Sequence, residues 1–425
     1  MPPALPVGDP APPSGRLSQR VLEQARGVPF GIYVHVPFCE SRCGYCDFNT
    51  YTATELGPGV SRGAYADTVL REIRLAADVL GDGDVLGDRF PPVTSIFFGG
   101  GTPTVLPAEH LGLIIREIGE RFGLADDVEI TTEANPETVT PAYFAKLKAA
   151  GFTRVSLGMQ SAVPWVLDML ERRHRAGRPE EAVREARAAG FEHVNLDLIY
   201  GAPRERDVDW QASLDAAIGA EPDHISAYAL VVEPGTAMAR QVDAGLVSPP
   251  DDDVLADRYV MADETLAAAG YEWYEVSNWS RSAAGRCRHN EIYWTDGTWW
   301  GFGPGAHSHV GDVRWWNVKH PVRYAALLEA GKSPAAGRET LNAEARLTER
   351  IMLGVRLRDG LPFADVPEAT RHVVGQLVSW GLIDRDAADE ELIVLTQRGR
   401  LLADAVVREL LRERASAWQW PQTAG

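Results

Sequence analysis

The feature of this chain that most limits its possible folds is a regular alternation of short apolar segments and longer amphipathic ones between residues 30 and 230. Short apolar runs predict buried strands, and longer runs with helical spacing predict helices, so the pattern indicates repeated βα units. We therefore expect an α/β fold in which a parallel sheet closes into a partial (β/α) barrel. The predicted strands are Gly31 to Val36, Thr94 to Phe98, Val128 to Glu133, Arg154 to Leu157, Val194 to Tyr200 and His224 to Leu230. The predicted helices are Tyr65 to Leu80, Ala108 to Phe122, Pro141 to Ala150, Pro179 to Ala189 and Val208 to Ala220.

The two ends of the chain differ from this central region. Residues 1–28 are rich in Pro, Ala and Gly and lack apolar periodicity, so we expect a disordered leader. The barrel is expected over residues 29–270, and a segment rich in Trp and Gly follows over residues 271–335. Helical patterns return over residues 336–425, with a short hairpin predicted from Leu382 to Asp384 and from Leu392 to Leu395. The C-terminal part is therefore expected to form a smaller, helical domain of winged-helix type.

The composition excludes several functional classes. With 45% hydrophobic and 24% charged residues, this chain of 425 residues has enough apolar material for a large core. Its net charge of −18 would repel the phosphate backbone of nucleic acids. No apolar run approaches the roughly 20 residues that cross a bilayer, and no secretory signal is recognisable. Four cysteines, three of them within eight residues, indicate a metal site in the reducing cytoplasm and argue against a disulfide framework.

Cys39, Cys43 and Cys46 form a C-x3-C-x2-C motif on the loop after the first predicted strand. Three soft thiolates this close together select an iron–sulfur cluster or zinc. On a four-iron cluster, three protein ligands leave one iron open to the amine and carboxylate of a small molecule. Zinc would require a fourth ligand, for which His35 and Asp47 are the neighbouring candidates. From the spacing alone, both hypotheses stay open.

The segment from Tyr33 to Cys46 resembles the signature of radical S-adenosylmethionine (SAM) proteins of the coproporphyrinogen oxidase group. This resemblance implies a radical SAM barrel, a 4Fe-4S cluster on the three cysteines and SAM on the open iron. Proteins of that superfamily use the reduced cluster to cleave SAM, which generates a 5′-deoxyadenosyl radical. Because such a radical would attack any neighbouring group, a site closed to water is expected.

The same resemblance places SAM contacts on the loops that follow the strands. Glycines after the second strand let a ligand approach the backbone closely, so valine at Gly100 is expected to weaken SAM binding more than folding. The alternatives are structural: a tight turn for the glycines, a helix cap for Glu133, a solvated Arg172 and a backbone partner for Asp197. Together these residues repeat the order of the family's motifs. The implied SAM-binding residues are Tyr33, Tyr45, Gly100, Gly101, Thr102, Glu133, Gln160, Arg172 and Asp197.

One position separates this chain from the coproporphyrinogen oxidases of the group. Those enzymes carry a fourth cysteine two residues after the third, and Phe48 occupies that position here. An aromatic ring cannot replace a thiol, so porphyrinogen decarboxylation is disfavoured. The segment around Phe48 instead resembles the sister family of heme chaperones called HemW.

A second motif agrees with that family. The segment from His289 to Trp294 matches its H-N-x-x-Y-W motif, and the resemblance implies heme as cargo with His289 as an iron ligand. Seven of the 12 tryptophans lie between residues 273 and 316, where aromatic faces suit a flat macrocycle. From the residues alone, the alternative is that these aromatics seal the barrel and that His289 is a buried structural histidine. Cys287 is a further candidate thiolate ligand and stays unassigned.

These resemblances predict a heme chaperone that binds the cluster, SAM and heme and passes heme to acceptor proteins, such as respiratory heme proteins. The alternative is an oxygen-independent coproporphyrinogen III oxidase of porphyrin biosynthesis, and a radical SAM methyltransferase or cyclopropanase is a third hypothesis. Phe48 argues against the oxidase, and the H-N-x-x-Y-W motif argues against the third class. Neither a nucleic-acid partner nor a membrane span is expected, while peripheral contact with a membrane stays compatible with the sequence. Cleavage of SAM and the oligomeric state stay open.

Overall fold

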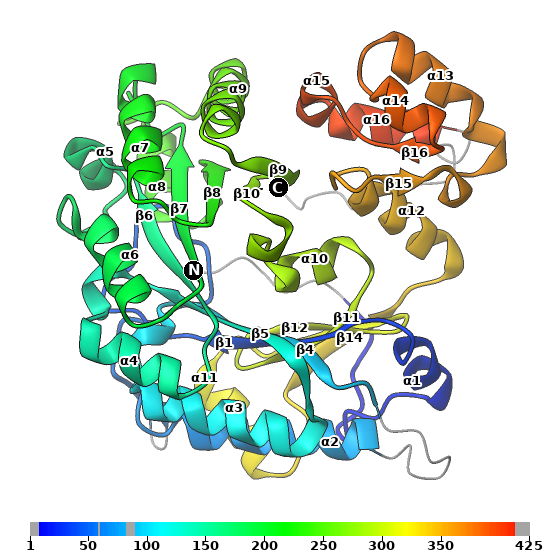
Figure 1. Cartoon of the computed structure of the whole chain (residues 1–425). Coiled ribbons are helices and arrows are strands. Elements are labelled where there is room, and N and C mark those ends of the chain that lie inside the picture. Colours follow the sequence, from blue (N-terminus) through cyan, green and yellow to red (C-terminus); the bar gives the residue numbers. More distant parts are fainter. Residues whose placement is uncertain (1–7, 58–59, 82–89, 413–425) are drawn as a thin grey trace. The chain divides into compact units, whose positions relative to one another are not determined.

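The computed structural model describes residues 8–57, 60–81 and 90–412 (Figure 1). The chain divides into two compact units. The first unit contains the chain up to Glu272 together with Trp279–Ile292 and Gly297–Thr340. The second contains Trp273–Asn278, Tyr293–Asp296 and the chain from Leu341 onward.

Six parallel strands form the centre of the first unit and follow one another through the sheet in chain order. They are β1 (Phe30–Val36), β4 (Val93–Gly100), β5 (Leu124–Ala134), β6 (Arg154–Gln160), β7 (His193–Tyr200) and β8 (His224–Ala229). Helices between the strands cover the outer face of the sheet (Figure 1): α2 (Tyr65–Gly81), α3 (Ala108–Phe122), α4 (Pro141–Ala149), α6 (Arg178–Ala188) and α7 (Asp207–Gly219). The predicted α/β barrel is therefore confirmed, and the bounds of its elements differ from the expected ones by a few residues.

The two faces of these strands carry different chemistry. Residues that point to the helices are apolar and fully buried, as Ile32, Phe98 and Leu157 illustrate. The alternate residues point into the barrel and are largely polar, because successive side chains of a strand lie on opposite faces. The core therefore lies between sheet and helices, and the barrel interior is free to hold a polar site.

Four further strands extend the sheet beyond β1. Strand β11 (Thr298–Phe302) runs parallel to β1, and β12 (His307–Val310), β13 (Val313–Asn317) and β14 (Ala335–Thr340) continue it as antiparallel neighbours. Much of the Trp- and Gly-rich segment is therefore part of the barrel sheet. The boundary expected after residue 335 falls inside β14, and the first unit ends at Thr340.

Part of the expected leader is ordered. Helix α1 (Gln19–Ala25) is capped by Ser18, whose hydroxyl accepts a hydrogen bond from the backbone N–H of Val21. This helix buries Val21, Leu22 and Ala25. The expectation of a disordered leader is therefore wrong for residues 8–28, because three apolar side chains of a short helix find a place in the core. Residues 1–7 lie outside the described residues.

The second unit is a small helical domain with a core of its own. Its helices are α12 (Ala343–Gly354), α13 (His372–Ser379), α14 (Arg385–Asp389), α15 (Gln397–Leu401) and α16 (Ala403–Leu410). The expected hairpin is only partly present. Strand β16 (Leu392–Ile393) pairs with β15 (Leu361–Pro362), whereas Ile383 forms a single bridge with Leu395. Residues 413–425 of the expected domain lie outside the described residues.

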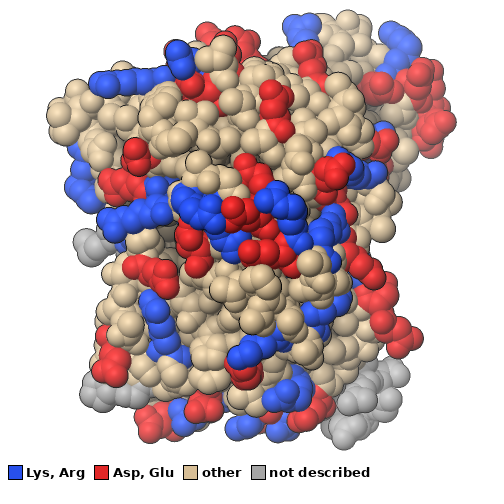
Figure 2. Space-filling model, turned by 60° about the vertical axis from the view of Figure 1, so that its left-hand side comes forward, with Lys and Arg blue, Asp and Glu red and all other residues tan. Residues whose placement is uncertain are grey.

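The remaining elements are short, apart from one long helix. They are β2 (Glu55–Gly57), β3 (Val60–Ser61), α5 (Pro164–Met169), α8 (Ala237–Asp243), α9 (Asp252–Ala268), β9 (Glu272–Glu275), β10 (Asn278–Ser280), α10 (Arg288–Trp294) and α11 (Pro321–Glu329). Among the described residues, no helix combines the length and apolarity needed to cross a bilayer. Acidic and basic side chains are interspersed over the face shown in Figure 2, so the net charge of −18 does not form a single field there.

Candidate functional site

The carboxyl ends of the barrel strands surround a cavity of about 420 Å³. Loops that follow several strands supply its lining, as is usual for the active face of a parallel barrel. Tyr33 lies deeper in the barrel, where its hydroxyl is 3.0 Å from Nδ1 of His35. The structure brings all the other predicted cluster and SAM residues to the cavity: Cys39, Cys43, Tyr45, Cys46, Gly100, Gly101, Thr102, Glu133, Gln160, Arg172 and Asp197.

The loop that carries the three cysteines is fixed at several points. The backbone N–H of Cys39 donates to the carbonyl of Tyr51 at 3.0 Å. The buried side-chain amide of Asn49 donates to the carbonyls of Pro304 and Lys319 at 2.9 and 2.8 Å. Sequence analysis missed Asn49, because a polar loop residue carries no signal of burial. The loop is therefore held to the strands on the far side of β1 as well as to its own barrel segment.

Thr102 and Arg172 are among the polar residues that contact the cysteine sulfurs. The hydroxyl of Thr102 donates to Sγ of Cys39 at 3.7 Å, and Nη1 of Arg172 donates to Sγ of Cys43 at 3.5 Å. Burial raises the pKa of Cys39 to about 11, and it also raises the pKa of Cys46. A cationic centre bound to these sulfurs would offset their desolvation and hold them as thiolates. The donor set therefore fits an iron–sulfur cluster.

The zinc alternative is disfavoured by the surroundings of His35. Its Nδ1 contacts the hydroxyl of Tyr33, and its Nε2 is 3.0 Å from the carbonyl of Asn49. Both ring nitrogens are thus engaged, and burial lowers the pKa of His35 to about 4. Within the described ranges, no three Cys, His, Asp or Glu side chains converge as ligands of a single ion would. A four-iron cluster bonds each thiolate to a different iron, so three cysteines around one cavity suit it better.

Gly100 and Gly101 are required by packing at the end of β4. A Cβ at Gly100 would lie 2.4 Å from Nδ1 of His35, and one at Gly101 would lie 2.5 Å from the carbonyl of Phe38. Gly100 also has a φ of +102°, which other residues rarely adopt. The expectation that valine at Gly100 weakens ligand binding more than folding is therefore wrong, because the added atoms would meet the protein itself.

Gly100→Ala is expected to lower the free energy of unfolding more than Gly151→Ala does. Both glycines have a φ of +102°, but a Cβ at Gly151 would have no atom within 4 Å. Gly151→Ala should cost about 1–2 kcal/mol for backbone strain. Gly100→Ala should cost a further ~1–3 kcal/mol for the displacement of His35. Urea unfolding of the two variants measures the difference, and equal losses would show that His35 moves aside freely.

Two partly buried acids, Glu133 and Asp197, belong to the cavity lining, together with two unpaired polar atoms. The backbone N–H of Gly100 donates to Oε2 of Glu133 at 3.1 Å. Burial and repulsion by Asp197 raise the pKa of Glu133 to about 8, and burial also raises the pKa of Asp197. Among the described residues, Oε1 of Gln160 and Nε of Arg172 have no hydrogen-bond partner. Such a lining suits a ligand like SAM, which combines cationic centres with several hydrogen-bonding groups.

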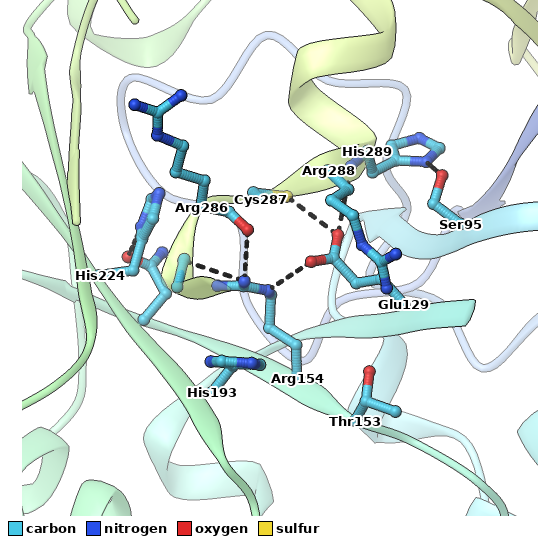
Figure 3. A network of polar contacts seen from close by, with 12 residues as sticks. Ser95, Glu129, Thr153, Arg154, His193, His224, Arg286, Cys287, Arg288 and His289 are labelled. Carbon is cyan, nitrogen blue, oxygen red and sulfur yellow. Dashed lines mark hydrogen bonds and ion pairs between the residues drawn. The ribbon is translucent and has the colours of Figure 1, made fainter. Parts of the chain in front are cut away.

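His289 lies at the other end of the barrel strands, on α10 (Figure 3). Its Nδ1 is 2.8 Å from the hydroxyl of Ser95, and its backbone N–H donates to Oε1 of Glu129 at 3.2 Å. Its ring stacks on Phe97, and the residue is 1% exposed. The structure thus brings His289 neither to the cavity nor to the surface. Ligation of heme by His289 stays a prediction, and it requires α10 to move.

A buried ion pair lies beneath this helix (Figure 3). Nε of Arg154 donates to Oε2 of Glu129 at 3.0 Å, and Nη2 of Arg154 donates to the carbonyls of Gly285 and Arg286 at 2.9 and 2.6 Å. The thiol of Cys287 donates to Oε1 of Glu129 at 3.6 Å. Burial and this carboxylate raise the pKa of Cys287 well above its usual value, so the sulfur stays protonated. Sequence analysis missed Glu129 and Arg154, because charged residues are usually exposed.

Comparison with known proteins agrees with this arrangement. Residues 33–217 match the family model of the Radical SAM superfamily. Among solved structures, coproporphyrinogen III oxidase (HemN) from Escherichia coli, a radical SAM enzyme, is similar with a TM-score of 0.77. The match covers 92% of both chains at 22% sequence identity and shows a shared fold.

Two sequence relatives extend over most of the chain. The heme chaperone HemW of Mycobacterium tuberculosis is 53% identical over 385 residues, which are 91% of this chain and 95% of that protein. The heme chaperone HemW of a Synechocystis species is 34% identical over 365 residues, which are 83% of this chain and 85% of that protein. The barrel, its cysteine-lined cavity and these relatives lead to one assignment: this chain belongs to the HemW family of the radical SAM superfamily.

Proposed function

We propose that this protein is a heme chaperone that binds a 4Fe-4S cluster, SAM and heme and transfers the heme to acceptor proteins. The names of its relatives support the chaperone function, and its superfamily implies the cluster and SAM. The proposal rests on one structural observation: exposed apolar side chains lie beside the cysteine-lined cavity.

The ligand roles follow from the lining of the cavity. Cys39, Cys43 and Cys46 hold the cluster, which when bound supplies an electron to SAM. The positive charge of Arg172 beside Cys43 offsets part of the thiolate charge. The other predicted residues that line the cavity bind the amino acid and ribose parts of SAM: Tyr45, Gly100, Gly101, Thr102, Glu133, Gln160 and Asp197. Tyr33 does not line the cavity, and its contact with SAM stays a prediction.

Three exposed apolar side chains form what we call the apolar rim: Phe48, Tyr228 and Val231. They are 55%, 40% and 61% exposed, and all three line the cavity. Large apolar groups left open to water beside a cavity indicate a ligand surface. A heme macrocycle offers a flat apolar face of the kind that aromatic rings pack against. Phe48 thus adds an aromatic face at the position where the oxidases carry a thiol.

Two assays separate the chaperone from an enzyme. Anaerobically reconstituted protein is expected to bind heme, seen as a Soret band in a titration, and to leave coproporphyrinogen III unchanged when SAM and reductant are present. Phe48→Ala should weaken heme binding about tenfold, because it removes an aromatic contact worth about 1–2 kcal/mol. The visible spectrum of the cluster should stay the same in this variant, since the cysteines are intact.

His289→Ala tests the other candidate heme site. If this variant shifts the Soret band and weakens heme binding while Phe48→Ala does neither, heme binds at α10 and the apolar rim has no part in it. If both variants bind heme like wild type, heme binds at a third site. Cys287 is then the next residue to replace.

The second candidate function is oxidative decarboxylation of coproporphyrinogen III. The shared fold with HemN is compatible with it, whereas the absence of a thiol at Phe48 is not. Wild-type protein that takes up no heme and converts coproporphyrinogen to protoporphyrinogen would replace the chaperone proposal. We place the protein in the cytoplasm, because its four cysteines are free and cluster thiolates need reducing surroundings.

A further inference from the structure

A row of buried polar side chains runs inward from Asp197 at the cavity. The hydroxyl of Ser156 donates to Oδ2 of Asp197 at 2.7 Å, and Nδ2 of Asn195 donates to Oδ1 at 2.7 Å. The same Nδ2 is 2.6 Å from Oγ of Ser156. On its other side, Oδ1 of Asn195 is 2.6 Å from Nδ1 of His224, the first residue of β8. We call these four residues the Asp197 relay.

The donors and acceptors of the relay fit together in one arrangement. Both oxygens of an ionised Asp197 can only accept, so Asn195 must turn its Nδ2 toward them, and Ser156 must donate its single hydrogen. The oxygen of Ser156 then accepts the second hydrogen of Nδ2. Oδ1 of Asn195 consequently faces His224, and Nδ1 of that ring must carry a hydrogen.

His224 can satisfy this requirement as a neutral ring. Burial lowers the pKa of His224 well below its usual value, and the positive charge of Arg154 lowers it further. A neutral imidazole has one N–H group, and Asn195 accepts it. Figure 3 shows His224 and His193 near the buried side chain of Arg154.

We propose that Asn195 and His224 are positioning residues for SAM, which hold the carboxylate of Asp197 oriented toward the cavity. The cavity is lined by Ser156 and Asp197 but not by Asn195 or His224, so both act through another residue. The inference rests on the proposed binding of SAM in this cavity. Without the N–H of His224, Oδ1 of Asn195 keeps only a longer hydrogen bond from the hydroxyl of Ser226, at 3.4 Å. The amide can then turn over more easily and place its oxygen against Asp197, which repels the carboxylate from its place.

Two substitutions at His224 separate hydrogen bonding from packing. The side-chain N–H of asparagine can replace that of Nδ1, whereas leucine fills the volume of the ring better but donates nothing. His224→Leu is expected to raise the Kd of SAM about tenfold, and His224→Asn should stay within about twofold of wild type. The Kd is measured by titrating SAM into the protein. The signal is the change that SAM causes in the electron paramagnetic resonance spectrum of the reduced cluster.

The matched control is His193→Leu, because His193 starts the neighbouring strand β7 and lies outside the relay. It should leave the Kd of SAM unchanged. Asn195→Asp provides a second test if His224→Leu does not fold. It keeps the shape of the side chain but turns a carboxylate toward Asp197, so the Kd is again expected to rise about tenfold.

The outcomes distinguish the relay from the site itself. A purely structural His224 predicts the reverse order, with leucine tolerated and asparagine harmful, and that result overturns the proposal. An unchanged Kd in Asn195→Asp overturns it as well. If Asp197→Ala binds SAM like wild type, the cavity is not the SAM site and the proposed function fails. If Asp197→Ala weakens SAM binding and His224→Leu does not, only the relay is wrong.

Discussion

Alanine at Cys39, Cys43 or Cys46 is expected to abolish the 4Fe-4S cluster. Each thiolate is the only protein ligand of its iron in the proposed site, and the described residues around the cavity offer no fourth cysteine. Loss of one sulfur therefore leaves two irons without a protein ligand, the substituted one and the one meant for SAM. Iron and sulfide analysis after anaerobic reconstitution measures the effect, together with the SAM-induced change of the cluster spectrum.

The fourth cysteine provides the control for this experiment. Cys287 is buried at the opposite end of the barrel, where its thiol contacts Glu129. Cys287→Ala should therefore keep the full iron and sulfide content and the response to SAM. A complete cluster in any of the three loop variants would show that the ligands are assigned wrongly.

The second large effect concerns folding. Glu129→Leu is expected to lower the free energy of unfolding by about 3–5 kcal/mol, because it leaves the buried guanidinium of Arg154 without its counter-charge. The backbone N–H of His289 would lose its acceptor in the same variant. Urea unfolding followed by circular dichroism measures the loss.

An exposed pair between the same strand, β5, and helix α10 is the matched control. Asp127 contacts Arg288 at 2.7 Å, but their side chains are 79% and 41% exposed. Asp127→Ala should cost less than about 1 kcal/mol, since water already solvates both charges. The double variant Glu129→Leu with Arg154→Met should recover part of the stability, because no unpaired charge remains. Equal losses in Glu129→Leu and Asp127→Ala would contradict the burial of the Glu129–Arg154 pair.

The barrel could be predicted because its helix-facing residues form continuous apolar runs. Phe98 and Leu157 are examples, and they also mark the strands whose loops carry the site. The same reasoning does not predict β11, because the residues from Trp299 to Gly301 show neither the apolar period of a helix nor that of a strand. It also fails at α1, where a Pro-rich stretch hides a helix of only seven residues.

The cavity could be predicted more completely than the barrel interior. Motif order predicted that Glu133, Gln160 and Asp197 gather on one face of the barrel, and all three line the cavity there. The partners of Asp197 could not be predicted in the same way. Asn195 and His224 come from two strands, and their contact depends on the register of those strands, in which Asn195 lies opposite His224.

The pairing of β1 with β11 has a consequence for biosynthesis. One edge of β1 stays open until Phe302 has been made, about 270 residues after its partner Val34. At ribosomal speeds of about 5–20 residues per second, this interval lasts tens of seconds. The carbonyls of Pro304 and Lys319, which hold Asn49 in the cysteine loop, appear later still. A nascent chain therefore carries an unpaired strand edge beside an unsupported loop. The loop is therefore expected to reach its cluster-binding geometry only after Lys319 has been made.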